Sequence, residues 1–308
     1  MAEATHSIVV TTTLTSNFLA CDGCWVGGSP MHKAVADLFG DGNGALADSA
    51  TAAGYSSTLL DGVTEVALVG HSAGGGLVAG TAGYMVGEGT IDRLVGVVML
   101  DGVGFGTVVP AALAKLPDDV PIYNLSGKSY FWNMSGSSNS ALEQARPGEF
   151  YGVRLVGGVH SDTMVGGNIF IQAGLYLVTG FSKPANVKAA EILRAAWING
   201  MFAGVAPTSG PLPSSPYYGV PGQLLDIATP RDAAQAYVSP GPAERLTLVD
   251  RIFTRLGNIL FAIDFATCVA DPQAGPVENP EILAPNTALS LDGRTKARQS
   301  IGQHVCTG

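Results

Sequence analysis

The stretch VTEVALVGHSAGGGLVAG, residues 63–80, sets a short apolar run directly before Gly-His-Ser-Ala-Gly. Residues 66–69 read as a buried strand, and the chain from Leu77 onward can begin a helix. A serine at such a corner is held in a strained backbone conformation with its hydroxyl projecting from the sheet. Glycines two positions before and after it, here Gly70 and Gly74, relieve crowding at the turn. The stretch therefore predicts a nucleophile elbow at Ser72; the alternative is a glycine-rich turn that contains a serine by chance.

The composition is that of a compact, loop-rich α/β enzyme and not of a disordered chain. Of the 308 residues, 46% are hydrophobic, only 13% are charged and 41 are glycine. The net charge of −9 and pI near 4.9 argue against nucleic acid as a partner, because a phosphate backbone needs a basic surface. The longest apolar runs are too short or too interrupted to span a bilayer. Residues 1–6 lack the basic start and apolar core of a signal peptide, although a trimmed mature form behind an added methionine would look the same.

The four cysteines indicate the cellular compartment in which the protein works. Cys21 and Cys24 have C-x-x-C spacing, but no second such pair or nearby pair of histidines completes a zinc site. We expect two disulfides, Cys21–Cys24 and Cys268–Cys306, and therefore a secreted or cell-envelope protein. Four reduced thiols in a cytoplasmic enzyme are the alternative.

Strands that alternate with helices indicate the fold class. Near-continuous apolar strands of this kind predict an α/β fold with a mostly parallel sheet flanked by helices. We expect residues 1–204 to form the catalytic core and residues 205–308 a C-terminal extension, with a proline-rich linker to residue 222, helices over 243–269 and a loop-like, disulfide-closed tail. The expected core strands are 7–13, 63–69, 94–100, 120–125 and 152–156, and the expected core helices are 31–39, 46–53, 77–86 and 186–202.

A nucleophilic serine needs a histidine base, and the chain offers five histidines. Only His160 follows a strand late in the sheet, where a loop can reach Ser72; its alternative role is structural. His71 lies inside the elbow motif and is expected to be a packing residue. His6 and His304 are near the ends of the chain, and His32 starts a helix ahead of the elbow.

The acid that orients the histidine is expected to be Asp101. It ends the strand after the elbow unit, whereas the more usual position, in the loop of residues 126–134, contains no carboxylate. Glu143 and Glu149 lie further on, in segments without strand-end geometry. An Asp-Gly pair is also a common turn former, which is the alternative role of Asp101.

These residues carry a family resemblance. Gly-His-Ser72-Ala-Gly-Gly, the VVMLDG that contains Asp101 and the GGVHSD that contains His160 resemble the α/β-hydrolase fold. The early acid is similar to the chlorophyllase-like branch, and SIVVTTT with the triple glycine resembles bacterial polyester hydrolases and triacylglycerol lipases. The resemblance covers about residues 7–204.

The resemblance implies a serine carboxylic-ester hydrolase with the triad Ser72, Asp101 and His160, no metal and no cofactor. Its substrate would be an ester of apolar character (lipid, polyester or small ester), with a lipid interface as a surface it can meet. Ala73 N–H would donate to the oxyanion. If the strand 7–13 is the third of the family's sheet, Leu14 or Thr15 supplies a second amide; if it is the fourth, Ala73 is the one certain donor. An acyltransferase with the same triad and an inactive binding protein of the same fold are the competing functions.

Overall fold

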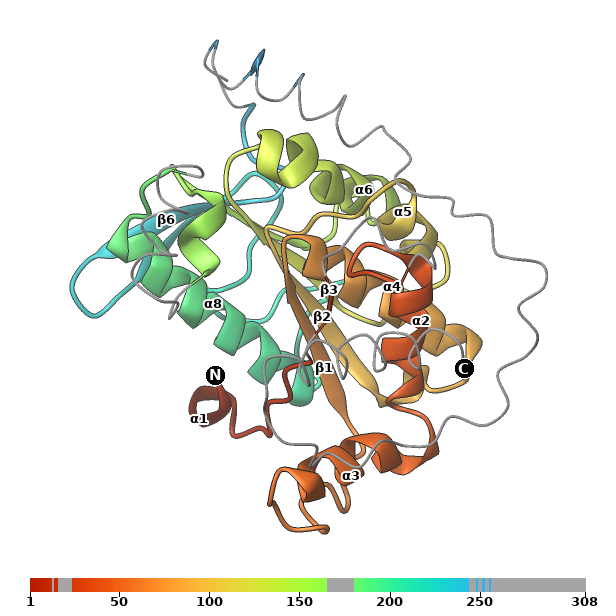
Figure 1. Ribbon diagram of the computed structural model, residues 1–308. Coiled ribbons are helices and arrows are strands. Elements are labelled where there is room, and N and C mark those ends of the chain that lie inside the picture. The colour runs from red at the N-terminus through yellow and green to blue at the C-terminus, as the bar shows by residue number, and fades with distance from the viewer. Residues whose placement is uncertain are drawn as a thin grey trace.

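The computed structural model describes residues 1–12, 14–15, 24–164 and 180–243, together with residues 248, 251, 252 and 255. Its centre is a six-stranded mixed sheet with the order β1-β2-β3-β4-β6-β5. The first four strands are parallel, and β6 joins β4 antiparallel before pairing with β5. The chain thus has an α/β architecture, with helices on both faces of the sheet (Figure 1). The strands are β1 (Val66–His71), β2 (Leu94–Leu100), β3 (Ile122–Ser126), β4 (Gly152–Leu155), β5 (Leu224–Ala228) and β6 (Ala233–Val238).

Apart from α3, the α-helices lie in two layers. One layer contains α2, α4, α5 and α6, and the other face of the sheet is covered by α8, against which the short α1 rests (Figure 1). The α-helices are α1 (Ala2–Thr5), α2 (Ser29–Asp37), α3 (Gly44–Ala52), α4 (Ala73–Gly87), α5 (Val108–Leu113), α6 (Ser137–Ala145) and α8 (Pro184–Phe202). Single 3-10 turns are η1 (Asp41–Asn43), η2 (Ile91–Arg93), η3 (Phe131–Gly136) and η4 (His160–Thr163).

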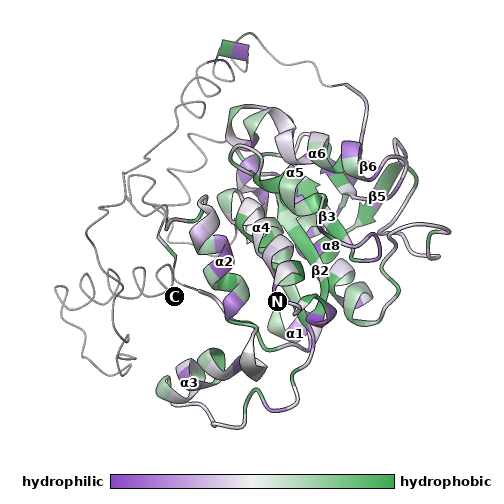
Figure 2. Cartoon of the chain, turned by 90° about the vertical axis from the view of Figure 1, so that its right-hand side faces the viewer, coloured by the Kyte–Doolittle hydropathy of each residue, from purple (hydrophilic) through white to green (hydrophobic). Residues whose placement is uncertain are grey.

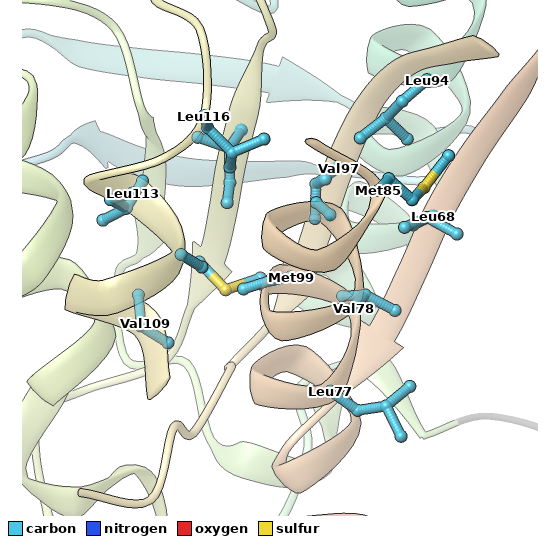
Figure 3. Close-up of a cluster of buried hydrophobic side chains, with 14 of the residues drawn as sticks. Leu68, Leu77, Val78, Met85, Leu94, Val97, Met99, Val109, Leu113 and Leu116 are labelled. Carbon is cyan, nitrogen blue, oxygen red and sulfur yellow. The ribbon is translucent and has the colours of Figure 1, made fainter. Parts of the chain in front are cut away.

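The pleat of β2 divides the core in two. Val97 and Met99 face the α4 layer, and Val98 and Leu100 face α8, because successive side chains of a strand point to opposite faces. Figure 3 shows the first cluster, in which side chains of α4 and α5 interlock with those of β1 and β2. Figure 2 shows hydrophobic residues concentrated along the central strands, between helices of paler or hydrophilic colour. The second cluster is built around Trp197 of α8, which is fully buried.

Most of the expected core elements form. The strand at 94–100 has the expected bounds, and the other strands from 63 onward and the four expected helices are each found within four residues of their expected limits. The strand expected at 7–13 was wrong over residues 7–12, which have no regular structure; residue 13 lies outside the described residues. Ile8, Val9 and Val10 are 44–53% exposed, because β-branched residues form a strand only where a neighbouring strand pairs with them.

The sheet also extends beyond residue 204, where we expected the core to end. β6 pairs with β4 through Val153↔Val238 and its neighbours, and Ile227 and Val238 are buried in the second cluster. Residues 224–238 are therefore part of the core and not of an appendage. The helices expected over 243–269 fall almost wholly outside the described residues, as does the tail. No helix in the described ranges has both the length and the apolarity to cross a membrane.

Candidate active site

Ser72 lies in the sharp turn between β1 and α4, as the sequence predicted. Its backbone has φ 55° and ψ −124°, a conformation that non-glycine residues seldom adopt. Two amides hold the turn by donating to the Ser72 carbonyl, Gly75 N and Val103 N, each at 2.8 Å. Ser72 itself is only partly buried.

The two flanking glycines are not equivalent. A Cβ on Gly70 would lie 1.9 Å from the carbonyl oxygen of Gly74, so residue 70 must be glycine for the turn to close. A Cβ on Gly74 would meet nothing within 4 Å. The expectation that both glycines relieve crowding thus holds for Gly70 and was wrong for Gly74.

Close packing also fixes the elbow against the loop that follows β2. A Cβ on Gly75 would lie 2.5 Å from the Cα of Gly102, the residue directly after Asp101. The start of α4 can approach this loop only because Gly75 has no side chain. The serine turn and the segment that carries the expected acid are therefore packed against each other.

Asp101 and His160 meet as the sequence predicted. Asp101 follows β2 and His160 begins η4 after β4, and His160 Nδ1 lies 2.6 Å from Asp101 Oδ2. Both residues are buried, with 2% and 5% of their surfaces exposed. The other carboxylate oxygen accepts hydrogen bonds from Gly127 N (3.1 Å) and Asn133 Nδ2 (3.0 Å). Since Nδ1 donates to the carboxylate, Nε2 is left to accept a proton.

The base and the serine are not hydrogen-bonded to each other. Although both residues are within the described part of the chain, no hydrogen bond joins the Ser72 hydroxyl to His160. Contacts of this kind are often long in a free enzyme and tighten when substrate binds. The Asp101–His160 half of the expected triad is therefore assembled, and the Ser72–His160 half is not.

His71 does more than pack inside the elbow, which corrects the sequence-based expectation. Its Nε2 donates to the backbone carbonyl of His160 at 3.0 Å, and the two rings lie 4.5 Å apart. Burial, reinforced by the nearby His160, lowers the pKa of His71 to about 4. At neutral pH it is an uncharged donor that ties the elbow to the loop of the base. Nothing in the spacing of the motif signals this contact.

The loop after β3 contributes three residues that the sequence did not mark as functional. The Tyr130 hydroxyl accepts a hydrogen bond from His160 N at 2.9 Å. The Trp132 ring stacks on the His160 ring, with 6.3 Å between centroids and 24° between planes. Asn133 donates to Asp101. The sequence showed only that this loop has no carboxylate.

Asp162 caps the turn that begins at His160. Its Oδ2 accepts from Val159 N at 2.9 Å, and burial raises the pKa of its carboxyl. This contact fixes the direction in which the chain enters η4. Glu143, by contrast, is exposed on α6, and Glu149 lies beside the buried Arg146 guanidinium at 3.8 Å. Neither glutamate has a contact with His160 in the described residues.

The expected oxyanion donors are only partly accounted for. Ala73 is the first residue of α4, so its N–H has no acceptor within the helix. Leu14 packs against the hydrophobic core, and the Thr15 carbonyl accepts from Val26 N at 2.9 Å. The second donor stays a prediction. No group of three or more His, Cys, Asp or Glu side chains in the described ranges is arranged to hold a metal ion.

Cys24 is buried and takes part in a disulfide bond, whose partner is not among the described residues. The Cys21–Cys24 pairing therefore stays a prediction. The Cys268–Cys306 pair lies wholly outside the described part of the chain.

No family model, curated protein or solved structure matches this chain.

Proposed function

We propose that the chain is a serine carboxylic-ester hydrolase in which Ser72, His160 and Asp101 act as a triad. The observation that carries the proposal is the buried 2.6 Å contact between His160 Nδ1 and Asp101 Oδ2. It occurs on loops that follow parallel strands, at the same sheet edge as a serine with a strained backbone. A turn former or a structural histidine would not need this pairing.

In this reaction the Ser72 oxygen attacks the acyl carbonyl while His160 Nε2 takes its proton. The proton then passes to the leaving alcohol, and water releases the acyl group by the same route. Asp101 keeps the imidazole in the tautomer that has Nε2 free and stabilises the imidazolium that forms. Ala73 N–H donates to the oxyanion, and a second donor is not assigned because residues 7–12, on which Leu14 or Thr15 depended, form no strand.

The parallel strands β1–β4 with helices on both faces support an α/β-hydrolase fold, with the acid after β2 as in the chlorophyllase-like branch. The disulfide at Cys24 supports export from the cytoplasm, because such bonds persist in oxidising compartments.

Aromatic side chains near the pair support an apolar ester as the substrate. Trp132 stacks on His160, and Phe131 lies against Trp132 with ring centroids 4.7 Å apart. On the loop after Asp101, Phe105 packs against Trp25 at 4.9 Å. All four rings are only partly buried, so they offer apolar surface to an acyl chain or to a lipid interface.

The test is a series of p-nitrophenyl esters from acetate to palmitate, run on wild type and Ser72→Ala, with Ser49→Ala on the exposed face of α3 as the matched control. We expect wild type and Ser49→Ala to hydrolyse the esters and Ser72→Ala to be inactive. Activity retained in a folded Ser72→Ala would reject the proposal. Added alcohol acceptors extend the test, since ester products in place of free acid would identify an acyltransferase.

An inactive binding protein of the same fold is the second candidate, favoured by the missing hydrogen bond between the described Ser72 and His160. A fluorophosphonate probe decides between the two. Labelling at Ser72 in the folded protein supports the hydrolase, and an unreactive Ser72 supports the binding protein.

A further inference from the structure

Asn133 is a buried amide whose hydrogen-bonding capacity is fully used. Only 3% of its surface is exposed. Its Nδ2 donates to Asp101 Oδ1 at 3.0 Å and to the Lys128 carbonyl at 2.8 Å. Its Oδ1 accepts from Tyr130 N and Gly136 N, both at 3.0 Å. Two donors and two acceptor positions are all that an asparagine side chain has, so the orientation of the amide is fixed.

Because of this amide, the two carboxylate oxygens of Asp101 have different hydrogen-bond partners. Oδ1 receives Asn133 Nδ2 and Gly127 N, while Oδ2 receives His160 Nδ1. An ionised carboxylate accepts hydrogen bonds and donates none, so three donors around it suit the charged form. Two of them on Oδ1 also prevent the carboxylate from turning about its last bond. Oδ2 is thereby held toward the imidazole.

The same short loop holds the histidine. Tyr130 receives the backbone N–H of His160, and Trp132 stacks on its ring. Within four consecutive residues, the loop after β3 thus contacts both members of the acid–base pair. It does so from the position where a triad acid is more usually found.

We propose that Asn133 is the positioning residue of the triad acid, acting through Asp101 and touching neither substrate nor serine. The inference rests on the proposed function. It explains why this loop carries an amide: a carboxylate at position 133 would face Asp101 across a hydrogen-bond distance, where two like charges repel each other and no donor is left for Asp101.

The decisive variant is Asn133→Asp. The new carboxylate can still accept from Tyr130 N and Gly136 N, but both donations of Nδ2, to Asp101 Oδ1 and to the Lys128 carbonyl, are lost. The matched control is Asn43→Asp. Asn43 is as buried, at 2% exposure, and donates to the Val63 carbonyl at the opposite end of β1 from Ser72. Both variants make the same chemical change, and only the first alters the acid.

We expect kcat of Asn133→Asp to fall about 10- to 100-fold at pH 8, the range for a lost orienting hydrogen bond, with KM within about twofold of wild type. Relative to wild type, kcat should recover on acidification, because a protonated carboxyl at position 133 can again donate to Asp101. Asn43→Asp should keep the kcat of wild type at every pH. A merely structural role for Asn133 would not lower kcat while KM stays within about twofold of wild type.

A second readout does not depend on turnover. The His160 Nδ1 proton should give a strongly deshielded NMR signal, assigned by its loss in Asp101→Asn. We expect this signal to shift or broaden in Asn133→Asp and to stay unchanged in Asn43→Asp. If wild type hydrolyses no ester yet the signal behaves in this way, the proposed function fails and the positioning role stands.

A folded Asn133→Asp with kcat within about threefold of wild type and an unchanged NMR signal would overturn the inference. If that variant does not fold, Asn133→Ala is measured in the same way. If neither folds, the amide is structural and the positioning role is rejected.

Discussion

The imidazole of His71 donates from Nε2 to the backbone carbonyl of His160 at 3.0 Å, so the residue before the proposed nucleophile is bonded to the residue that supplies the proposed base. The acceptor is a carbonyl, so Nε2 carries a proton, and in the neutral ring Nδ1 carries none. With its pKa lowered to about 4, His71 stays uncharged down to mildly acidic pH. Acid leaves this bond in place, because the imidazolium also donates from Nε2, but it puts a positive charge on a buried ring beside His160.

His71 should make the fold sensitive to acid. An unfolded histidine has a pKa near 6.5, so between that value and about 4 the unfolded chain binds the proton more tightly than the folded chain. The stabilisation is complete above pH 6.5 and is lost as the pH falls to about 4. The shift corresponds to about 3 kcal/mol in the free energy of unfolding. His71→Gln, which can still donate to His160 but cannot titrate, should remove this loss.

Urea unfolding at pH 7 and pH 4.5 checks the prediction. Wild type should lose more stability between the two values than His71→Gln does. His32, whose pKa is also lowered by burial, should leave some acid sensitivity in the variant. Equal losses in the two proteins would contradict the assignment.

Asp101→Asn should reduce kcat by about 10⁴, because an asparagine favours the wrong imidazole tautomer in a triad of this type. The variant should stay folded, since an amide can occupy the same space. Glu143→Gln and Glu149→Gln are the controls and should stay within about threefold of wild type, since neither contacts His160 in the described residues. If the kcat of Asp101→Asn stays within about tenfold of wild type while a glutamate variant loses nearly all of its kcat, Asp101 is not the orienting acid.

The two glycines around Ser72 should respond in opposite ways to alanine. Gly70→Ala puts a Cβ 1.9 Å from a backbone oxygen that cannot easily move, and should cost at least about 1–3 kcal/mol of stability. Gly74→Ala meets open space near the start of α4 and should be neutral or gain up to about 1 kcal/mol. Unfolding midpoints in urea measure both. Comparable losses in the two variants would contradict the turn geometry.

A chain cut after residue 204 should fail to fold cooperatively. The cut removes β5 and β6, which pair with the edge of β4 and bury large side chains such as Leu225, Ile227 and Val238. Each such side chain contributes about 2 kcal/mol, and the exposed edge of β4 invites aggregation. A chain ending at residue 243 is the control. A soluble, monomeric 1–204 chain with a sharp unfolding transition would show that the expected boundary is correct after all.

The strands that the sequence predicted most accurately are those buried on both faces. β2 was found with its expected limits because all seven of its residues are apolar or glycine. β5 and β6 were missed because their buried positions alternate with exposed ones over only five or six residues, and several of these residues are alanine, which is a weak strand former. The 7–13 segment failed for the opposite reason: its β-branched residues suit a strand but have no neighbouring strand over 7–12.

In the candidate site too, some contacts were predictable from the sequence and others were not. Asp101 and His160 were predictable as a pair because both follow parallel strands, whose carboxyl ends meet at one edge of the sheet. The contacts of His71 and Asn133 were not, because they depend on the path of irregular segments. Met134 and Ser135, directly after Asn133, both have positive φ, which no local sequence signal required.

β1 is one of the two edge strands of the sheet, with β2 as its one neighbour among the described residues. The strand that leads into the proposed nucleophile is thus attached along a single side in the described part of the chain, as β5 is at the opposite edge. Its amides should exchange with heavy water sooner than those of β2 and β3, and mild heating should detach it before the rest of the sheet melts. The working lifetime of the proposed site is then governed by the fraying of one strand, and strengthening the outer edge of β1 would prolong it without raising the melting temperature of the whole.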